Sequence, residues 1–192
     1  MAGANWRPPN GFMAWQSTVG YLNTHHSADA SLFMLITPLP DDSISWTAGV
    51  SWSSIHERVE DHHTLSDALA KLWTRVSERH NVFLTADDAI RAPSGYQDSD
   101  WLDIGTLSIL QRIIMTMQSV ASGHWSLTMM YQPSEHADRR IELSLKTEDE
   151  SITGLVHHQT LLHACRALYR HIAPQVVYTV QQRATTVTQA DE

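Results

Sequence analysis

Hydrophobic residues recur every three or four positions in two distant stretches of the chain, and this spacing predicts two amphipathic helices. The first helix covers about residues 10–26 and the second about residues 100–122. Their apolar stripes are Phe12, Trp15, Val19 and Leu22 in the first, and Leu107, Leu110, Ile114 and Met117 in the second. Each residue of the second stripe lies 95 positions after its counterpart in the first, so the two helices share one pattern.

Apolar and polar residues alternate strictly after each of these helices. Residues 44–52 alternate isoleucine, tryptophan, alanine and valine with serine, threonine and glycine, and residues 140–146 alternate apolar with polar or charged residues. A period of two is typical of a strand with one buried face. Leu32 and Met34 recur as Leu127 and Met129, again 95 positions later, and predict the partner strand of each hairpin.

The correspondence continues through a second helix and a last strand in each half. After one added residue, the stripe Leu65, Leu72 and Val76 recurs as Leu161, Leu168 and Ile172. Residues 81–85 and 175–179 are rich in β-branched and aromatic residues, which favour strands. The sequence therefore predicts an internal duplication of an αββαβ unit.

The fold class expected from this pattern is α+β, with an antiparallel sheet covered by helices on one face. We expect residues 1–192 to form a single domain made of two repeats, 10–86 and 104–180. Residues 87–103 are the expected linker, and residues 184–192 a polar C-terminal tail.

Charge and composition exclude several classes of protein. The formal net charge is −8 with no clustered basic stretch, which argues against a nucleic-acid binder that contacts the phosphate backbone. No apolar run has the length of a membrane helix, and no signal peptide is recognisable at the N-terminus. The single Cys165 fits a reducing compartment, so we expect a cytoplasmic protein that contacts no membrane.

The chain is also rich in histidine. Protonating all 12 histidines would add 12 positive charges to the net −8 and give +4, so the protein's charge should respond strongly between pH 7 and 5. His56, Glu60, His62 and His63 lie in one short stretch and are candidate zinc ligands. This stretch lacks the two histidines four apart that flank a glutamate in zinc proteases. The other interpretation is that the histidines are polar residues before a helix.

No catalytic motif is present, so the sequence favours a protein that is not an enzyme. There is no glycine-flanked nucleophilic serine and no glycine-rich phosphate loop. Cys165 lies on the apolar stripe of its helix, where cysteine usually behaves as a small buried hydrophobic residue.

The sheet face turned away from the helices is the most informative surface. Alternation places on it seven uncharged residues, which form the candidate interface: Phe33, Leu35, Ser45, Thr47, Gly49, Ser51 and Met130. Large apolar residues on an uncovered face indicate a partner contact, although single exposed apolar residues are common.

We therefore expect a non-enzymatic protein-interaction or assembly module, such as an adaptor, a chaperone-like protein or a structural subunit, which binds a protein partner or itself as a homo-oligomer. No cofactor is expected under this interpretation. One alternative is a histidine-rich metal-binding protein or metallohydrolase that uses zinc. Another is a small-molecule binder with a pocket between the repeats.

Overall fold

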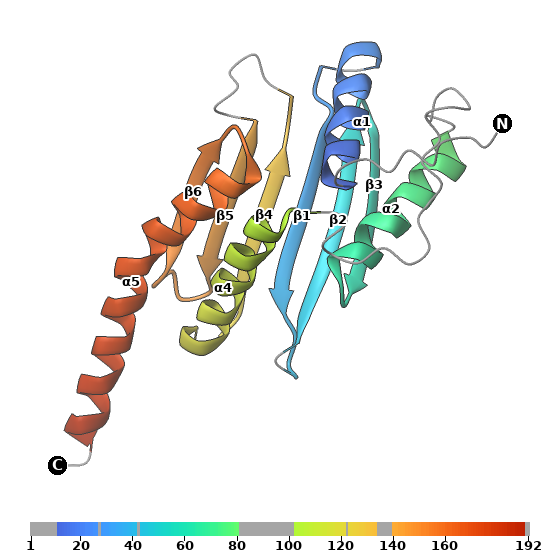
Figure 1. Ribbon diagram of the computed structural model, residues 1–192. Coiled ribbons are helices and arrows are strands. Elements are labelled where there is room, and N and C mark those ends of the chain that lie inside the picture. Colours follow the sequence, from blue (N-terminus) through green and yellow to red (C-terminus); the bar gives the residue numbers. More distant parts are fainter. Residues whose placement is uncertain are drawn as a thin grey trace.

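Six antiparallel strands form a single sheet in the computed structural model, which describes residues 11–26, 28–41, 43–80, 102–121, 123–133 and 140–190. The strands are β1 (Ser31–Pro38), β2 (Ile44–Trp52), β3 (Ile55–His62), β4 (Trp125–Tyr131), β5 (Ile141–Thr147) and β6 (Thr153–His158). Their order across the sheet is β3-β2-β1-β4-β5-β6 (Figure 1). The predicted α+β class and antiparallel sheet are confirmed.

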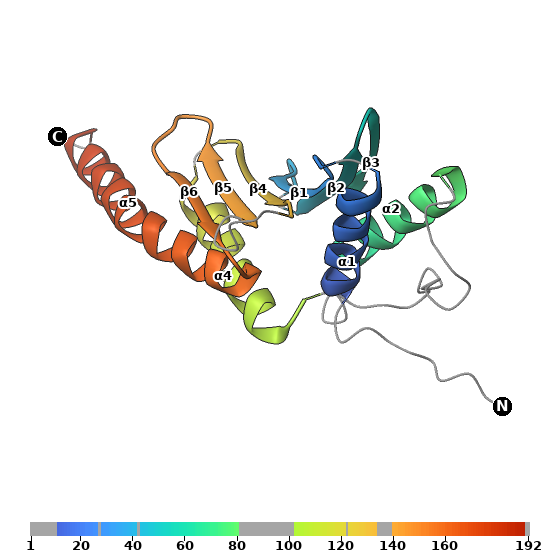
Figure 2. The same ribbon diagram turned by 90° about the horizontal axis from the view of Figure 1, so that it is seen from above.

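Four helices in the described ranges pack on one side of this sheet. They are α1 (Gly11–His25), α2 (Leu65–His80), α4 (Ile104–Val120) and α5 (Leu161–Ala190). Helix α2 contacts β2 and β3, and α5 contacts β5 and β6, while α1 lies against β1 and β2. Figure 2 shows that the opposite side of the sheet carries no helix within the described ranges. We call that side the outer face.

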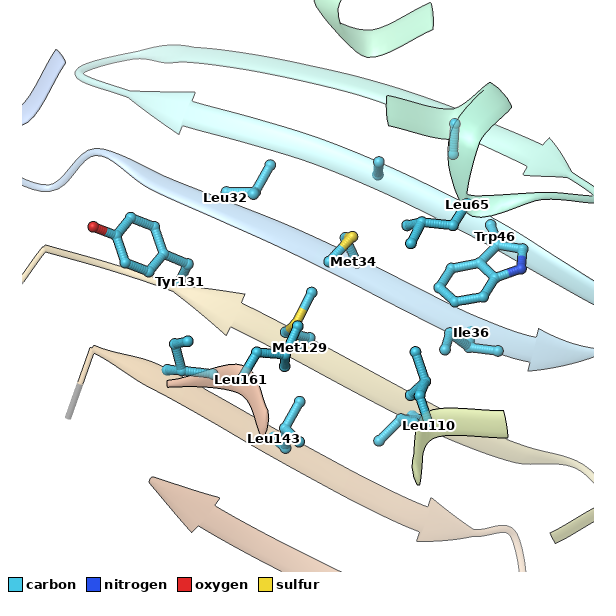
Figure 3. Packing of buried hydrophobic residues seen from close by; sticks show 14 of the residues in the cluster. Leu32, Met34, Ile36, Trp46, Leu65, Leu110, Met129, Tyr131, Leu143 and Leu161 are labelled. Atoms are coloured by element: carbon cyan, nitrogen blue, oxygen red, sulfur yellow. The ribbon is translucent and has the colours of Figure 1, made fainter. Parts of the chain in front are cut away.

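The core lies between the helices and the inner face of the sheet. The residues expected there on alternation and helical spacing are buried, and they are Trp15, Leu32, Met34, Trp46, Val50, Leu72, Leu110, Leu127, Leu143, Leu145 and Leu168. Figure 3 shows the central part of this layer, where side chains from β1, β4 and β5 meet those of α2, α4 and α5. The expected strand register on the inner face is therefore confirmed.

The two halves of the sheet meet at β1 and β4. These strands pair antiparallel, and Met34 lies directly opposite Met129 at the middle of the ladder. On either side of this pair, Leu32 is opposite Tyr131 and Ile36 is opposite Leu127. Met129 follows Met34 by 95 positions, so these two methionines, which match in the sequence comparison, are also neighbours in space.

The order of elements in each half differs from the prediction. Both halves run helix, strand, strand, strand, helix, so the expected αββαβ unit is wrong and αβββα is observed. Strands β3 and β6 were not predicted, and residues 175–179 belong to helix α5 rather than to a strand. The matching run at 81–85 lies outside the described residues. In β3 the inward position of Glu57 interrupts the apolar alternation by which strands are recognised.

Helix α2 begins at a recognisable N-cap, whereas helix α5 extends beyond the range expected from the sequence. The backbone N–H of Asp67 donates to the Thr64 hydroxyl at 3.1 Å, so Thr64 is the N-cap of α2. Helix α4 ends at Val120, with Ala121 as its C-cap. Helix α5 continues to Ala190 and so includes most of the polar segment expected as a tail.

Candidate interaction surface

An uncharged row of side chains crosses five strands of the outer face. The ladder pairs Leu35 with Thr47 on one side and with Thr128 on the other. Beyond Thr128 the row continues through Ser144 to Leu155 on β6. Leu155 is 56% exposed, although it is a large apolar residue. Depletion of charge combined with exposed apolar side chains is characteristic of the core of a protein interface.

The neighbouring row carries the aromatic centre of this surface. Phe33 lies between Gly49 on β2 and Met130 on β4. A Cβ atom at Gly49 would lie only 2.1 Å from the Phe33 ring, so the ring packs directly over the glycine. Met130 is 37% exposed beside it. Glycine at position 49 thus lets the phenylalanine lie flat across β2 while one side of the methionine remains open.

The predicted interface residues lie on the outer face, but three of them, Ser45, Thr47 and Gly49, are buried there. Ser45 and Thr47 are 3% and 7% exposed, although none of the described helices covers them. Larger neighbours enclose these small side chains. Leu35 lies opposite Thr47, and the Ser45 hydroxyl donates to the Asp61 carboxylate at 3.4 Å. The accessible part of the surface therefore includes the half-buried Phe33 and Leu35 and the exposed Met130 and Leu155, whereas Ser45 and Thr47 are enclosed.

Leu155 is the outer-face residue that the sequence did not reveal. Because β6 was not recognised as a strand, Thr153, Leu155 and His157 were not seen to alternate with the inward Gly154 and Val156. Among the three outward positions of β6, Leu155 is the single large apolar residue, so it is the one sequence feature of this strand that indicates the surface.

Charged residues flank the apolar rows on both sides. Beside Phe33, the Arg58 guanidinium carbon lies 6.0 Å from the ring centroid, and its side chain pairs with Glu60 at 2.6 Å. On the other side, Glu142 lies next to Met130, with its carboxylate 3.7 Å from the His157 imidazole. Both margins therefore carry charge of both signs, Arg58 with Glu60 on β3 and Glu142 with Lys146 on β5.

The four candidate zinc ligands do not form one site. His56 and Glu60 belong to the outer face of β3, whereas His62 lies opposite Trp46 on the inner face, and His63 follows the strand. Within the described part of the chain, no group of three or more histidine, cysteine, aspartate or glutamate residues could hold a metal ion. His157 and His158, which are likewise adjacent in sequence, do not share a site either, because His157 pairs with Glu142 and His158 stacks on His163 with ring centroids 5.2 Å apart.

Two buried polar groups lie on the helix side of the sheet. The Glu57 carboxylate is bound by His80 Nε2 at 2.8 Å and by the Arg79 guanidinium at 3.2 Å. Burial alone would raise the pKa of Glu57, but these hydrogen bonds and charges outweigh it and lower that pKa. Burial raises the pKa of Cys165 to about 12, and Asp103 adds to the effect, so this thiol is not a nucleophile near neutral pH.

A hollow of about 560 Å³ lies where the two halves of the chain meet. The β1–β2 turn contributes Pro38, Leu39 and Pro40, and the end of α4 with the start of β4 contributes Ala121 and Trp125. This hollow is one place where a small molecule between the two halves would bind, but among the described residues that line it there is no lysine, arginine, aspartate or glutamate.

None of the helices in the described ranges has both the length and the apolar character needed to span a bilayer. Comparison with known proteins adds no functional information. No protein-family model, no curated protein and no solved structure matches this chain.

Proposed function

We propose that this protein is a non-enzymatic, cytoplasmic interaction module that self-associates through the outer face of its sheet. The observation that supports this proposal most strongly is the uncharged row Thr47–Leu35–Thr128–Ser144–Leu155, with Phe33 and Met130 beside it. Contiguous exposed apolar surface is rare on monomeric proteins unless it is a contact site.

A second copy of the chain fits this surface because the surface complements itself. Consider a two-fold axis that runs parallel to the strands, above the outer face and over the boundary between β1 and β4. It would place Phe33 of each copy over Met130 of the other, an aromatic–thioether contact that stabilises interfaces. The same axis would bring Arg58 at one margin toward Glu142 at the opposite margin, where their opposite charges attract.

The proposal includes the internal duplication read from the sequence. It is supported by the hairpin registers, because Leu32 lies opposite Val50 and Leu127 lies opposite Leu145, each pair offset by 95 positions. In a duplicated scaffold each half contributes three strands of the outer face, and this arrangement is consistent with an assembly role.

The single residue added in the second half also has a structural explanation. Lys146 pairs with Thr153, whereas Ser51 pairs with His56, so the β5–β6 turn is two residues longer than the β2–β3 turn. Strand β3 contains one extra residue, in a bulge at Asp61, whose φ is 59°. The second half therefore gains two residues in its turn but lacks the bulge residue, so its net insertion is one residue. In this register His158 is the counterpart of His62.

Methyl NMR of labelled methionines tests the proposal on the unmodified protein. Met130 lies on the outer face, and Met115 is 69% exposed on α4 at the other side of the molecule. We expect the Met130 methyl resonance to shift on dilution as the dimer dissociates, while that of Met115 stays constant. If both resonances are independent of concentration, or if only Met115 shifts, self-association through the outer face is wrong.

A further inference from the structure

A second hollow, also of about 560 Å³, lies between β3 and α2 and concentrates positive charge. Four basic side chains line it: Lys71, Arg75 and Arg79 from α2, and Arg58 from β3. The two carboxylates in its wall are Glu60 and Glu78. Four of the 13 lysines and arginines of an acidic chain therefore gather at one place.

The spacing of these cations costs the helix some stability, which Asp67 and the position of Arg79 in the last turn offset in part. Lys71, Arg75 and Arg79 follow one another at intervals of four, so their side chains lie on one face of α2. Like charges four residues apart repel and destabilise a helix. Such a stripe is consistent with a negative group that binds across it.

Three of the cations are already held in place by the protein. A guanidinium nitrogen of Arg75 donates to the backbone carbonyl of Arg58, and Arg58 itself pairs with Glu60 at 2.6 Å. The buried Glu57 holds Arg79 at 3.2 Å. Groups that are ordered before binding lose less conformational entropy when a ligand arrives.

The charges of Arg75 and Lys71 are the least compensated. Arg75 is bonded to a neutral carbonyl group, and Lys71 makes no ion pair among the described residues. Between their positions on the helix lies Thr74, whose hydroxyl donates to the Ala70 carbonyl and retains its lone pairs.

His62 contributes an imidazole to the same wall. Burial and the positive charges of Lys71 and Arg75 lower its pKa, while Asp67 and Asp61 oppose them. The imidazole is therefore neutral at pH 7 and can donate one N–H. An anion bound beside it would stabilise the protonated form and raise this pKa.

We infer that the hollow between β3 and α2 binds the phosphate or pyrophosphate group of a small ligand, held by Lys71, Arg75 and His62. Guanidinium and ammonium groups are the usual protein partners of phosphate oxygens, and a multiply charged anion gains most from several converging cations. The volume exceeds that of a phosphate group and falls within the range of small-molecule sites, so an organic part of the ligand can also be accommodated. This site goes beyond the proposed self-association, because neither Lys71 nor Arg75 belongs to the outer-face rows.

Isothermal titration calorimetry with inorganic pyrophosphate in a chloride buffer tests the inference. We expect saturable binding by the wild type and at least a tenfold loss of affinity in Lys71→Glu. Arg112→Glu is the control, because this exposed residue lies on α4 and its substitution reverses a positive charge in the same way. No saturable binding by the wild type, or an equal loss in both variants, would overturn the inference.

A second readout locates the anion. Histidine NMR titrations should show that pyrophosphate raises the pKa of His62, whereas the chemical shifts of His171, which is exposed on α5, should not respond to pyrophosphate. Arg75→Gln, which removes charge without reversing it, should abolish the His62 response while circular dichroism shows that the protein remains folded. Pyrophosphate binding that leaves His62 unchanged in the wild type would place the anion elsewhere and contradict the site.

Discussion

The side-chain amide of Gln175 hydrogen bonds to both backbone groups of Thr153, accepting from its N–H and donating to its carbonyl, each at 2.8 Å. Thr153 begins β6, the edge strand of the sheet, so a glutamine of α5 occupies the position that another strand would take. Open edges are the places where sheets associate incorrectly, and this contact closes part of one.

We predict that Gln175→Ala lowers the free energy of unfolding by about 1 kcal/mol, because two partly exposed hydrogen bonds are lost. Urea unfolding measures this change. Gln111→Ala is the control, since Gln111 is exposed on α4 and undergoes the same substitution in a helix. Equal stability of the two variants would show that the Thr153 contact contributes nothing.

Substitution by alanine should lower the stability of the protein at one glycine and raise it at another. A Cβ at Gly154 would lie 2.6 Å from Leu168 Cδ1 and 3.1 Å from Ile172 Cγ2, both in the core, so Gly154→Ala should destabilise by roughly 1–3 kcal/mol. Gly20 lies inside α1, and a Cβ added there would have no neighbouring atom of the described residues within 4 Å, so Gly20→Ala should stabilise by about 0.5–1 kcal/mol. Thermal unfolding of both variants measures the signs. A Gly154→Ala protein as stable as wild type would mean that α5 packs less closely on β6 than described.

The buried carboxylate of Glu57 should make stability depend on pH. Its pKa is lower in the folded state than the ordinary value of 4.5, so its contribution is complete above 4.5 and is lost as pH falls through the folded-state value. Glu57→Gln should be less stable than wild type by about 1 kcal/mol at pH 7, because Arg79 and His80 lose a charged partner while the Arg79 side chain stays 61% exposed. The difference should shrink below pH 4.5.

Glu60→Gln is the matched control, because Glu60 pairs with Arg58 at the surface, where ion pairs contribute little. Chemical unfolding at pH 7 and at pH 3.5 gives both differences. A Glu57→Gln deficit that stays constant over this range would contradict the proposed role of the ionised carboxylate.

Charge reversal tests the orientation proposed for the dimer. Arg58→Glu should weaken association, because it places a negative charge toward Glu142 of the other copy. The double variant Arg58→Glu, Glu142→Arg should regain most of the lost affinity, and sedimentation velocity measures wild type, both single variants and the double variant. If the double variant is no better than the sum of the two single changes, the two residues do not meet across the interface.

The sequence predicted the parts of this fold whose pattern is local. The alternation of Trp46, Ala48 and Val50 determines which face of β2 is buried, and helical spacing identifies the stripes of α1 and α4. Strand β3 could not be predicted this way, because Glu57 takes an inward position that is satisfied only by His80 and Arg79, more than twenty residues later.

The sequence predicted a strand at Val176–Val177–Tyr178, where the structure has a helix. Its residue types favour strands, yet it continues α5, where Val176 packs against the core while Val177 and Tyr178 are exposed. For the candidate surface, alternation placed Phe33, Leu35 and Met130 correctly on the outer face. It could not show that Ser45 and Thr47 are enclosed there, because enclosure depends on neighbours from other strands.

Sedimentation equilibrium of wild type, Met130→Lys and Met115→Lys tests self-association through the outer face most directly. Both methionines are exposed, at 37% and 69%, and the substitutions are identical, so only the face of the molecule differs. We expect twice the chain mass for wild type and for Met115→Lys, and the mass of one chain for a folded Met130→Lys protein. A monomeric wild type, or a Met130→Lys protein that remains dimeric, would show that the outer face does not mediate self-association.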